Sequence, residues 1–185
     1  MGFGIGGLDW KDFVLFLSFF FIFFMGKIDD IYLIIIKMSY HQIYLHCIFA
    51  TKYRQQLLHP KHDDEVQKYI TGIVQNRQCK MMAINNVEDH LHMLVALHPS
   101  YSPAKLMQEV KANSAKFINE SNWYSYKFQW QGGYACFSYA QSEVKNVSNY
   151  IFRQKEHHRK TEFKDEYLGL LEKFHIPYDE KYVFE

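Results

Sequence analysis

The sequence contains little cysteine, and no part of it has the pattern of a disulfide scaffold. Cys47, Cys79 and Cys136 are isolated, odd in number and without a C-x-x-C pair. This usage also argues against a cysteine zinc site and is typical of a reducing cytoplasm, where we expect the protein to reside. No internal repeat or low-complexity linker follows residue 38, and 185 residues are enough for one substantial core, so a single folded domain is expected.

A hydrophobic run of membrane-spanning length is also missing. The uncharged stretch from Phe13 to Met25 is shorter than the roughly 20 residues of a spanning helix, and it lacks the basic segment and cleavage site of a signal peptide. We therefore interpret residues 1–37, which hold eight of the sixteen phenylalanines, as an extension outside a domain of residues 38–185. A short membrane anchor is the alternative for this stretch, but no stable membrane partner is expected.

The net charge of +1 hides an uneven distribution along the chain. Residues 1–37 carry −1 and residues 161–185 carry −4, so residues 38–160 carry +6. A basic body with an acidic tail indicates a polyanionic partner, and nucleic acid is the most frequent one. An ordinary solvated surface is the alternative.

Two histidines interrupt the start of a strongly apolar segment. Residues 91–97 are almost entirely apolar and are soon followed by Pro99, which predicts a buried strand. Because side chains two positions apart on a strand point to the same side, His90 and His92 would leave the sheet together, close enough to share one metal ion. Placing two imidazoles there is costly unless something binds them. A half-exposed strand end is the alternative.

The rest of the chain predicts an alternation of strands and helices. Ile43, Leu45, Cys47 and Phe49 alternate on one face of a strand at 40–51, and Ser102-Pro103 has the cap and first-turn residues of a helix. Further strands are predicted at 80–87 and 134–139, and helices at 63–76, 102–120, from Ser142 onward, and 163–174. The order β-α-β-β-α-β predicts an α+β, ferredoxin-like fold: an antiparallel sheet with helices on one face, followed by C-terminal helices.

Tyr150 and Gln154 lie four positions apart on the third predicted helix and therefore on one helical face. Neither belongs to the predicted apolar stripe, so both can project toward the sheet; the stripe consists of Val144, Val147, Ile151 and Phe152. A metal ion that polarises a phosphate would allow the weakly acidic tyrosine hydroxyl to attack it. The alternative is that Tyr150, one of fourteen tyrosines, packs on the helix surface.

Several motifs together resemble the HUH single-tyrosine transposases, the small transposases of single-strand insertion sequences and their REP-associated relatives. These motifs are His90-Leu91-His92, Gln131-Gly132-Gly133-Tyr134, the segment from Asn149 to Gln154, Tyr44-Leu45-His46, residues 49–54 and the run from Glu156 to Lys160. The resemblance covers residues 38 to about 182, which is nearly the whole chain apart from the extension.

The resemblance implies an enzyme that cleaves and rejoins single-stranded DNA at hairpin-flanked element ends. Tyr150 would form a 5′-phosphotyrosine link, and Mg²⁺ or Mn²⁺ would be bound by His90, His92 and Gln154. Imidazole pairs usually suit zinc, copper, iron or nickel, so only the resemblance selects magnesium. The family also implies a homodimer in which the histidines of one subunit meet the tyrosine of the other.

The basic residues predicted to contact DNA are Lys52, Arg54, Lys105, Lys111, Lys116 and Arg153. Two alternatives to a transposase remain open. One is a ferredoxin-like module that binds single strands by stacking, without cleavage. The other is a metal-dependent nuclease in which water attacks the phosphate and Tyr150 is structural.

Overall fold

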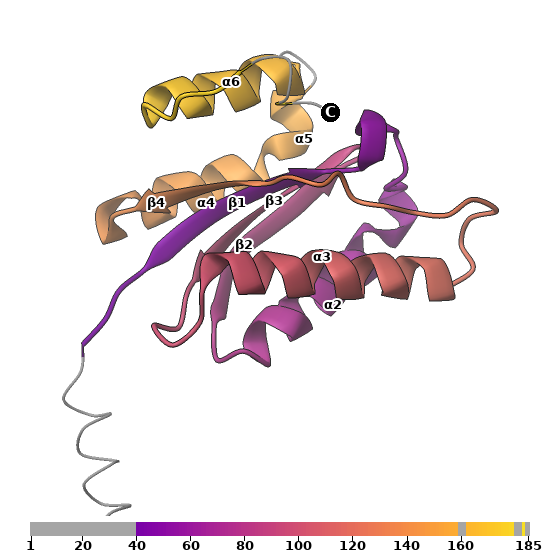
Figure 1. Ribbon diagram of the computed structural model, residues 1–185, viewed down its shortest axis with the longest axis horizontal. Coiled ribbons are helices and arrows are strands. Elements are labelled where there is room, and N and C mark those ends of the chain that lie inside the picture. The colour runs from indigo at the N-terminus through magenta and orange to yellow at the C-terminus, as the bar shows by residue number, and fades with distance from the viewer. Residues whose placement is uncertain (1–39, 159–161, 180–182, 184–185) are drawn as a thin grey trace, which may run out of the picture. The chain divides into compact units, whose positions relative to one another are not determined.

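A four-stranded antiparallel sheet forms the centre of the fold in the computed structural model, which describes residues 40–158, 162–179 and 183 (Figure 1). The strands β1 (Tyr44–Ala50), β2 (Lys80–Val87), β3 (His90–Ala96) and β4 (Ala135–Tyr139) lie in the order β2-β3-β1-β4. Every strand pairing is antiparallel. This arrangement confirms the predicted ferredoxin-like sheet. The expectations for residues 1–37 lie outside the described residues.

Two helices, α2 (Asp63–Gln75) and α3 (Pro103–Glu120), cover one face of the sheet (Figure 1). Alternation along β1 places Leu45, Cys47 and Phe49 on this face, where they join the largest hydrophobic core. The predicted cap of α3 is present, because the Ser102 side chain accepts a hydrogen bond of 3.2 Å from the backbone N–H of Lys105.

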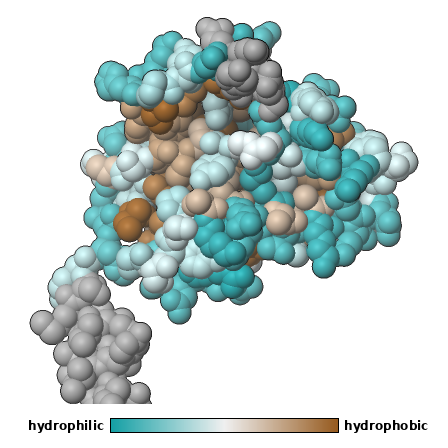
Figure 2. All heavy atoms as spheres, viewed as in Figure 1, coloured by the Kyte–Doolittle hydropathy of each residue, from teal (hydrophilic) through white to brown (hydrophobic). Residues whose placement is uncertain are grey.

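The C-terminal helices α4 (Val144–Phe152), α5 (Gln154–His157) and α6 (Phe163–Lys173) lie on the opposite face of the sheet (Figure 1). Leu94 of β3 packs there with Val147 and Ile151 of α4. His92 and His90 are two and four positions before Leu94, so the alternation of β3 directs both imidazoles to the same side. The space-filling view shows hydrophobic residues gathered between α6 and the sheet (Figure 2).

The third predicted helix differs from its expectation in three respects. Gln141–Glu143 forms a short 3-10 turn, and Glu143 rather than Ser142 precedes the first residue of α4. Phe152 is 58% exposed and does not belong to the core, because the apolar stripe ends at Ile151. Arg153 interrupts the helix with φ −92° and ψ 9°, so Tyr150 and Gln154 lie on the successive helices α4 and α5. Among the described residues, no helix is long and apolar enough to cross a membrane.

Candidate active site

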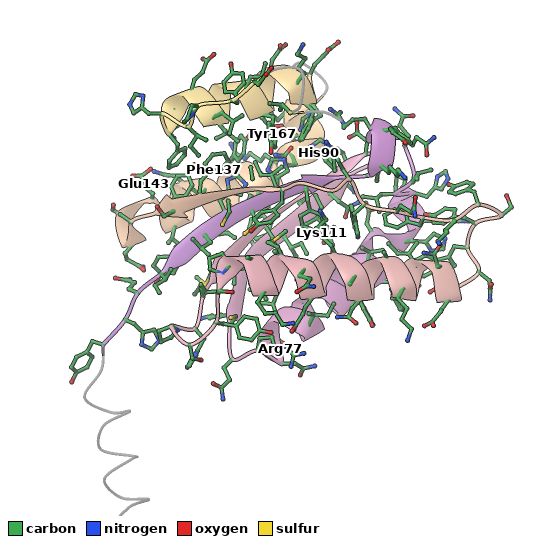
Figure 3. The ribbon with its side chains drawn as sticks, in the orientation of Figure 1. Arg77, His90, Lys111, Phe137, Glu143 and Tyr167 are labelled. Carbon is green, nitrogen blue, oxygen red and sulfur yellow. The ribbon has the colours of Figure 1, made fainter. Side chains whose placement is uncertain are left out.

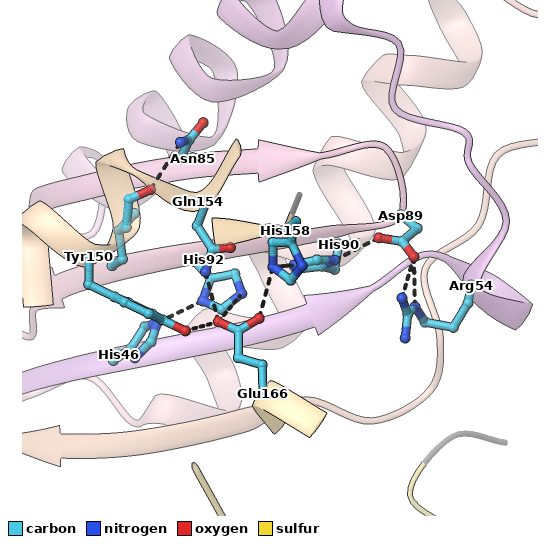
Figure 4. Close-up of polar contacts among 11 residues, drawn as sticks. His46, Arg54, Asn85, Asp89, His90, His92, Tyr150, Gln154, His158 and Glu166 are labelled. Atoms are coloured by element: carbon cyan, nitrogen blue, oxygen red, sulfur yellow. Dashed lines mark hydrogen bonds and ion pairs between the residues drawn. The ribbon is translucent and has the colours of Figure 1, made fainter. Parts of the chain in front are cut away.

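The predicted metal ligands and the predicted nucleophile lie together on the α4 side of the sheet (Figure 4). His90, His92 and Gln154 are buried, with exposed fractions of 1%, 0% and 0%. The ring centroids of His92 and Tyr150 are 6.1 Å apart. A single chain therefore brings these four side chains into one cluster.

Two further ligand-type residues, His158 and Glu166, complete this cluster (Figure 4). His158 Nε2 lies 3.0 Å from His90 Nε2 and 2.8 Å from one Glu166 carboxylate oxygen. The other Glu166 oxygen lies 3.6 Å from His92 Nε2. One candidate ligand atom from each of His90, His92, His158 and Glu166 lies within 4.8 Å of the others.

The sequence held only weak signals for these two residues. His158 stands in the basic run that contributed to the family resemblance, and Glu166 was counted only as part of the charge of an acidic tail. Nothing local in the sequence places α6 over the histidines. The structure does so by packing Phe163 and Leu171 of α6 against Ile48 and Phe137 of the sheet.

Glu166 also contacts the predicted nucleophile. Its carboxylate accepts a hydrogen bond from the Tyr150 hydroxyl and another, of 2.9 Å, from Gln154 Nε2. Burial raises the pKa of Glu166 to about 8, because the charged form loses its hydration. The tyrosine hydroxyl is thus oriented toward the cluster rather than toward solvent.

His46 on β1 supports His92 from behind. His46 Nε2 and His92 Nδ1 are 3.0 Å apart and both rings are buried. Burial lowers the pKa of His46 to about 3 and holds the pKa of His92 well below its ordinary value, so both rings are neutral at pH 7. If His92 donates through Nδ1, its Nε2 lone pair is available, and this atom makes no hydrogen bond within the described part of the chain.

The Asp89 carboxylate contacts the Nδ1 atom of His90. Asp89 Oδ1 lies 2.6 Å from His90 Nδ1, and Arg54 Nε donates a hydrogen bond of 3.0 Å to Asp89 Oδ2. Burial opposes ionisation of Asp89, but the hydrogen bonds from His90 and Arg54 outweigh it and lower its pKa. A carboxylate in this position fixes the tautomer of His90 and directs Nε2 into the cluster.

The donor set fits a divalent metal ion. It combines neutral imidazoles with a carboxylate, and His90 and His92 each have a second ring nitrogen held by a neighbouring side chain. Nε2 of His92 is buried and makes no hydrogen bond within the described residues, and binding to a metal ion would offset the cost of burying this polar atom.

Asn85 of β2 holds the segment that joins Tyr150 to Gln154. It is the register partner of His92 on the neighbouring strand. Its side-chain amide donates hydrogen bonds of 2.9 Å to the carbonyl of Ile151 and 3.2 Å to the carbonyl of Phe152. One side chain thereby ties the helix break to β2, the strand that pairs with the histidine strand β3.

A second tether follows Gln154. Lys155 Nζ lies 2.5 Å from Asp63 Oδ2 at the start of α2, and Asn86 donates a 2.6 Å hydrogen bond to Asp63 Oδ1. The α4–α5 segment is thus docked on its own sheet from both sides of Gln154. The structure holds a single chain, in which Tyr150 reaches that chain's own histidines. A site shared between subunits remains an expectation from the family resemblance.

The three lysines predicted on α3 lie on the opposite side of the sheet from the histidines (Figure 3). Lys105 and Lys116 form ion pairs along the helix, 3.5 Å to Glu109 and 3.7 Å to Glu120. Lys111 is instead bound to the backbone, with Nζ 2.6, 2.9 and 2.8 Å from the carbonyl oxygens of residues 131, 132 and 133. Its half-buried ammonium group therefore holds this glycine-containing loop, and a DNA contact by Lys111 stays a prediction.

Two of the other predicted DNA-contacting residues, Arg54 and Arg153, adjoin residues of the cluster. Arg54 binds Asp89 and lies over the Phe163 ring, 4.0 Å from its centroid, so its role is at least partly structural. Lys52 Nζ donates a 3.2 Å hydrogen bond to Gln129 Oε1. Arg153 is exposed at the junction of α4 and α5. Among the six, Arg153 is the residue next to Gln154.

Fold and site together define a ferredoxin-like protein with a buried histidine cluster and an adjoining tyrosine. Residues 39–154 match the family model described as "Transposase IS200 like", and the chain belongs to this family of transposases.

Solved structures are similar to this chain in fold. One is a candidate transposase from Deinococcus radiodurans, which is 20% identical with a TM-score of 0.51; the match covers 63% of this chain and 94% of that one. Another is a REP-associated tyrosine transposase bound to a REP hairpin, 15% identical with a TM-score of 0.49, covering 65% and 74% of the two chains. A comparison with curated proteins finds no match.

Proposed function

We propose that this transposase cleaves and rejoins single-stranded DNA through a covalent link to Tyr150. The observation that carries the proposal is the position of the Tyr150 hydroxyl, which is hydrogen-bonded to Glu166 within the cluster of His90, His92 and Gln154. A tyrosine that merely packed on the surface of α4 would not need its hydroxyl at this cluster.

In the proposed cleavage step, the Tyr150 oxygen attacks the scissile phosphorus and the hydroxyl proton is released. The bond between phosphorus and the 3′ oxygen breaks, which leaves a free 3′-OH and a 5′-phosphotyrosine. A second 3′-OH then attacks this phosphorus, and Tyr150 leaves and regains a proton. The covalent link conserves the bond energy, so rejoining needs no ATP.

His90, His92 and Gln154 are the residues we propose to hold Mg²⁺ or Mn²⁺. When bound, the ion would polarise the phosphate and offset the charge that develops on it. Ionising a free tyrosine at pH 7 costs about 4 kcal/mol, so activation of the phosphate is essential for this nucleophile. Glu166 and Asn85 orient the tyrosine segment toward the place where the phosphate must lie.

The DNA partner we propose is a single strand that carries hairpins, as the family resemblance implies. The charge of +6 on residues 38–160 supports binding of a polyanion. We retain a homodimer as part of the proposal, but with each active site built from one chain. The docking of α4 and α5 on their own sheet supports this assignment.

The experiment is covalent trapping on a labelled, hairpin-containing single strand with Mn²⁺ or Mg²⁺. Wild-type protein should form a DNA adduct stable to denaturation, and Tyr150→Phe should form none. Tyr69→Phe, on α2 across the sheet, is the matched control and should retain the adduct. Cleavage without an adduct would favour the water-dependent nuclease, and binding without cleavage would favour the binding module.

A further inference from the structure

His158 and Glu166 lie beyond the segment that matches the family model, which ends at residue 154. We propose that both are ligands of the metal ion, together with His90 and His92, and that they make the site selective for a first-row transition metal over Mg²⁺. This inference rests on the proposed metal site, adds two ligands to His90, His92 and Gln154, and narrows the proposed ion from Mg²⁺ or Mn²⁺ to a transition metal.

The distances between the candidate donor atoms are compatible with one bound ion. Two donors bound at about 2.1 Å to one ion lie about 3.0–3.4 Å apart in octahedral or tetrahedral geometry. The observed separations are 3.0 Å between His90 and His158, 2.8 Å between His158 and Glu166, and 3.6 Å between Glu166 and His92. These contacts use both Glu166 oxygens; with one donor atom from each residue, the four atoms lie within 4.8 Å of one another, close to the roughly 4.2 Å that separates opposite donors of one ion. A small adjustment would therefore bring the four side chains around a single ion.

Neighbouring side chains orient the proposed ligands, as expected for a metal site. His90 contacts Asp89 and His92 contacts His46, each through the ring nitrogen that faces away from the cluster. The Glu166 carboxylate accepts a hydrogen bond of 2.9 Å from the Gln154 amide. Outer partners of this kind fix the orientation of metal ligands. Glu166 is also 8% exposed, and burying a carboxylate is costly unless it is paired or bound to a cation.

The chemistry of the donors decides the metal. Three imidazoles suit zinc, copper, iron and nickel ions far better than Mg²⁺, which prefers oxygen ligands and retains much of its water. Gln154 donates to Glu166 through its amide nitrogen and keeps its place in the metal site through Oε1, which makes no hydrogen bond within the described residues. When bound, the ion would be held by these five side chains and would polarise a phosphate oxygen that enters its coordination sphere.

The test measures metal binding directly on the full chain. Co²⁺ and Mn²⁺ affinities are determined by competition with a chromophoric chelator for the wild type, Glu166→Gln and His158→Asn. The matched controls are Asp165→Asn, an exposed neighbour on α6, and His175→Asn, an exposed histidine with φ 52° that asparagine also tolerates. Glu166→Gln and His158→Asn should each weaken binding by more than about tenfold, whereas the controls should bind as the wild type does.

Two measurements keep the outcome decisive. X-ray absorption of the Co²⁺-loaded wild type should count three imidazole ligands, and two would overturn the inference even if a variant failed to fold. Wild-type affinity in both Glu166→Gln and His158→Asn, or Mg²⁺ bound as tightly as Co²⁺, would also overturn it. A protein that binds Co²⁺ through three histidines but never forms a DNA adduct would refute the proposed function alone.

Discussion

Asn85 offers the most informative perturbation, because it touches neither DNA nor metal in the proposed mechanism. Its amide is the donor to the carbonyls of Ile151 and Phe152, between the nucleophile Tyr150 and Gln154. We expect Asn85→Ala to loosen this segment from the sheet while the histidine strand stays in place.

The magnitude follows from the two hydrogen bonds. Each contributes about 0.5–1.5 kcal/mol net, so their loss weakens the docking of the segment by about 1–3 kcal/mol. This corresponds to about 5- to 150-fold, an upper bound for the fall in the rate of adduct formation at saturating DNA and metal. Asn85→Asp should be at least as severe, because a carboxylate would face two carbonyl oxygens.

The assay is the single-turnover rate of covalent adduct formation, with DNA affinity measured in parallel. The rate should fall and the affinity should remain within about twofold, which a general loss of folded protein would not produce. Asn113→Ala is the matched control, because Asn113 also donates to a helix carbonyl, that of Glu109 at 2.8 Å, but on α3 across the sheet. An Asn85→Ala protein that forms the adduct at the wild-type rate would refute the positioning role.

Other predictions concern the site, the metal, the DNA and the extension. Mixing His92→Ala with Tyr150→Phe chains should restore no cleavage if, as we propose, each site is built from one chain; rescue in verified mixed dimers would instead establish a shared site. EDTA, or the substitution His90→Ala, should abolish cleavage while hairpin binding largely survives, since phosphate contacts lie elsewhere; full cleavage in EDTA would contradict metal dependence. DNA affinity, measured by fluorescence anisotropy, should fall steeply between low and physiological salt as counterions are displaced, and a flat response would rule out the basic body as the binding surface. A protein beginning at Met38 should be folded and active by circular dichroism and adduct formation, and precipitation of this truncation would show that residues 1–37 belong to the fold.

Local patterns in the sequence were sufficient for the fold. Alternation of apolar residues predicted β1, a continuous apolar run predicted β3, and helical spacing with the Ser102 cap predicted α3. These signals are local because strand and helix periodicities are set by backbone geometry. The alternation of side chains along β3 placed His90 and His92 on one side of the sheet, where the structure also has them.

Only the tertiary structure decided which side chains share the site. Glu166 follows His92 by 74 positions and joins it because α6 buries Phe163 and Leu171 against the sheet. Lys111 was indistinguishable in sequence from its solvated neighbours, yet it is bound to the carbonyls of a distant loop. The helix break at Arg153 and its tether by Asn85 depend on β2 lying beside α4. Such pairings join residues far apart in the chain, so they arise from packing between elements, which local periodicity does not encode.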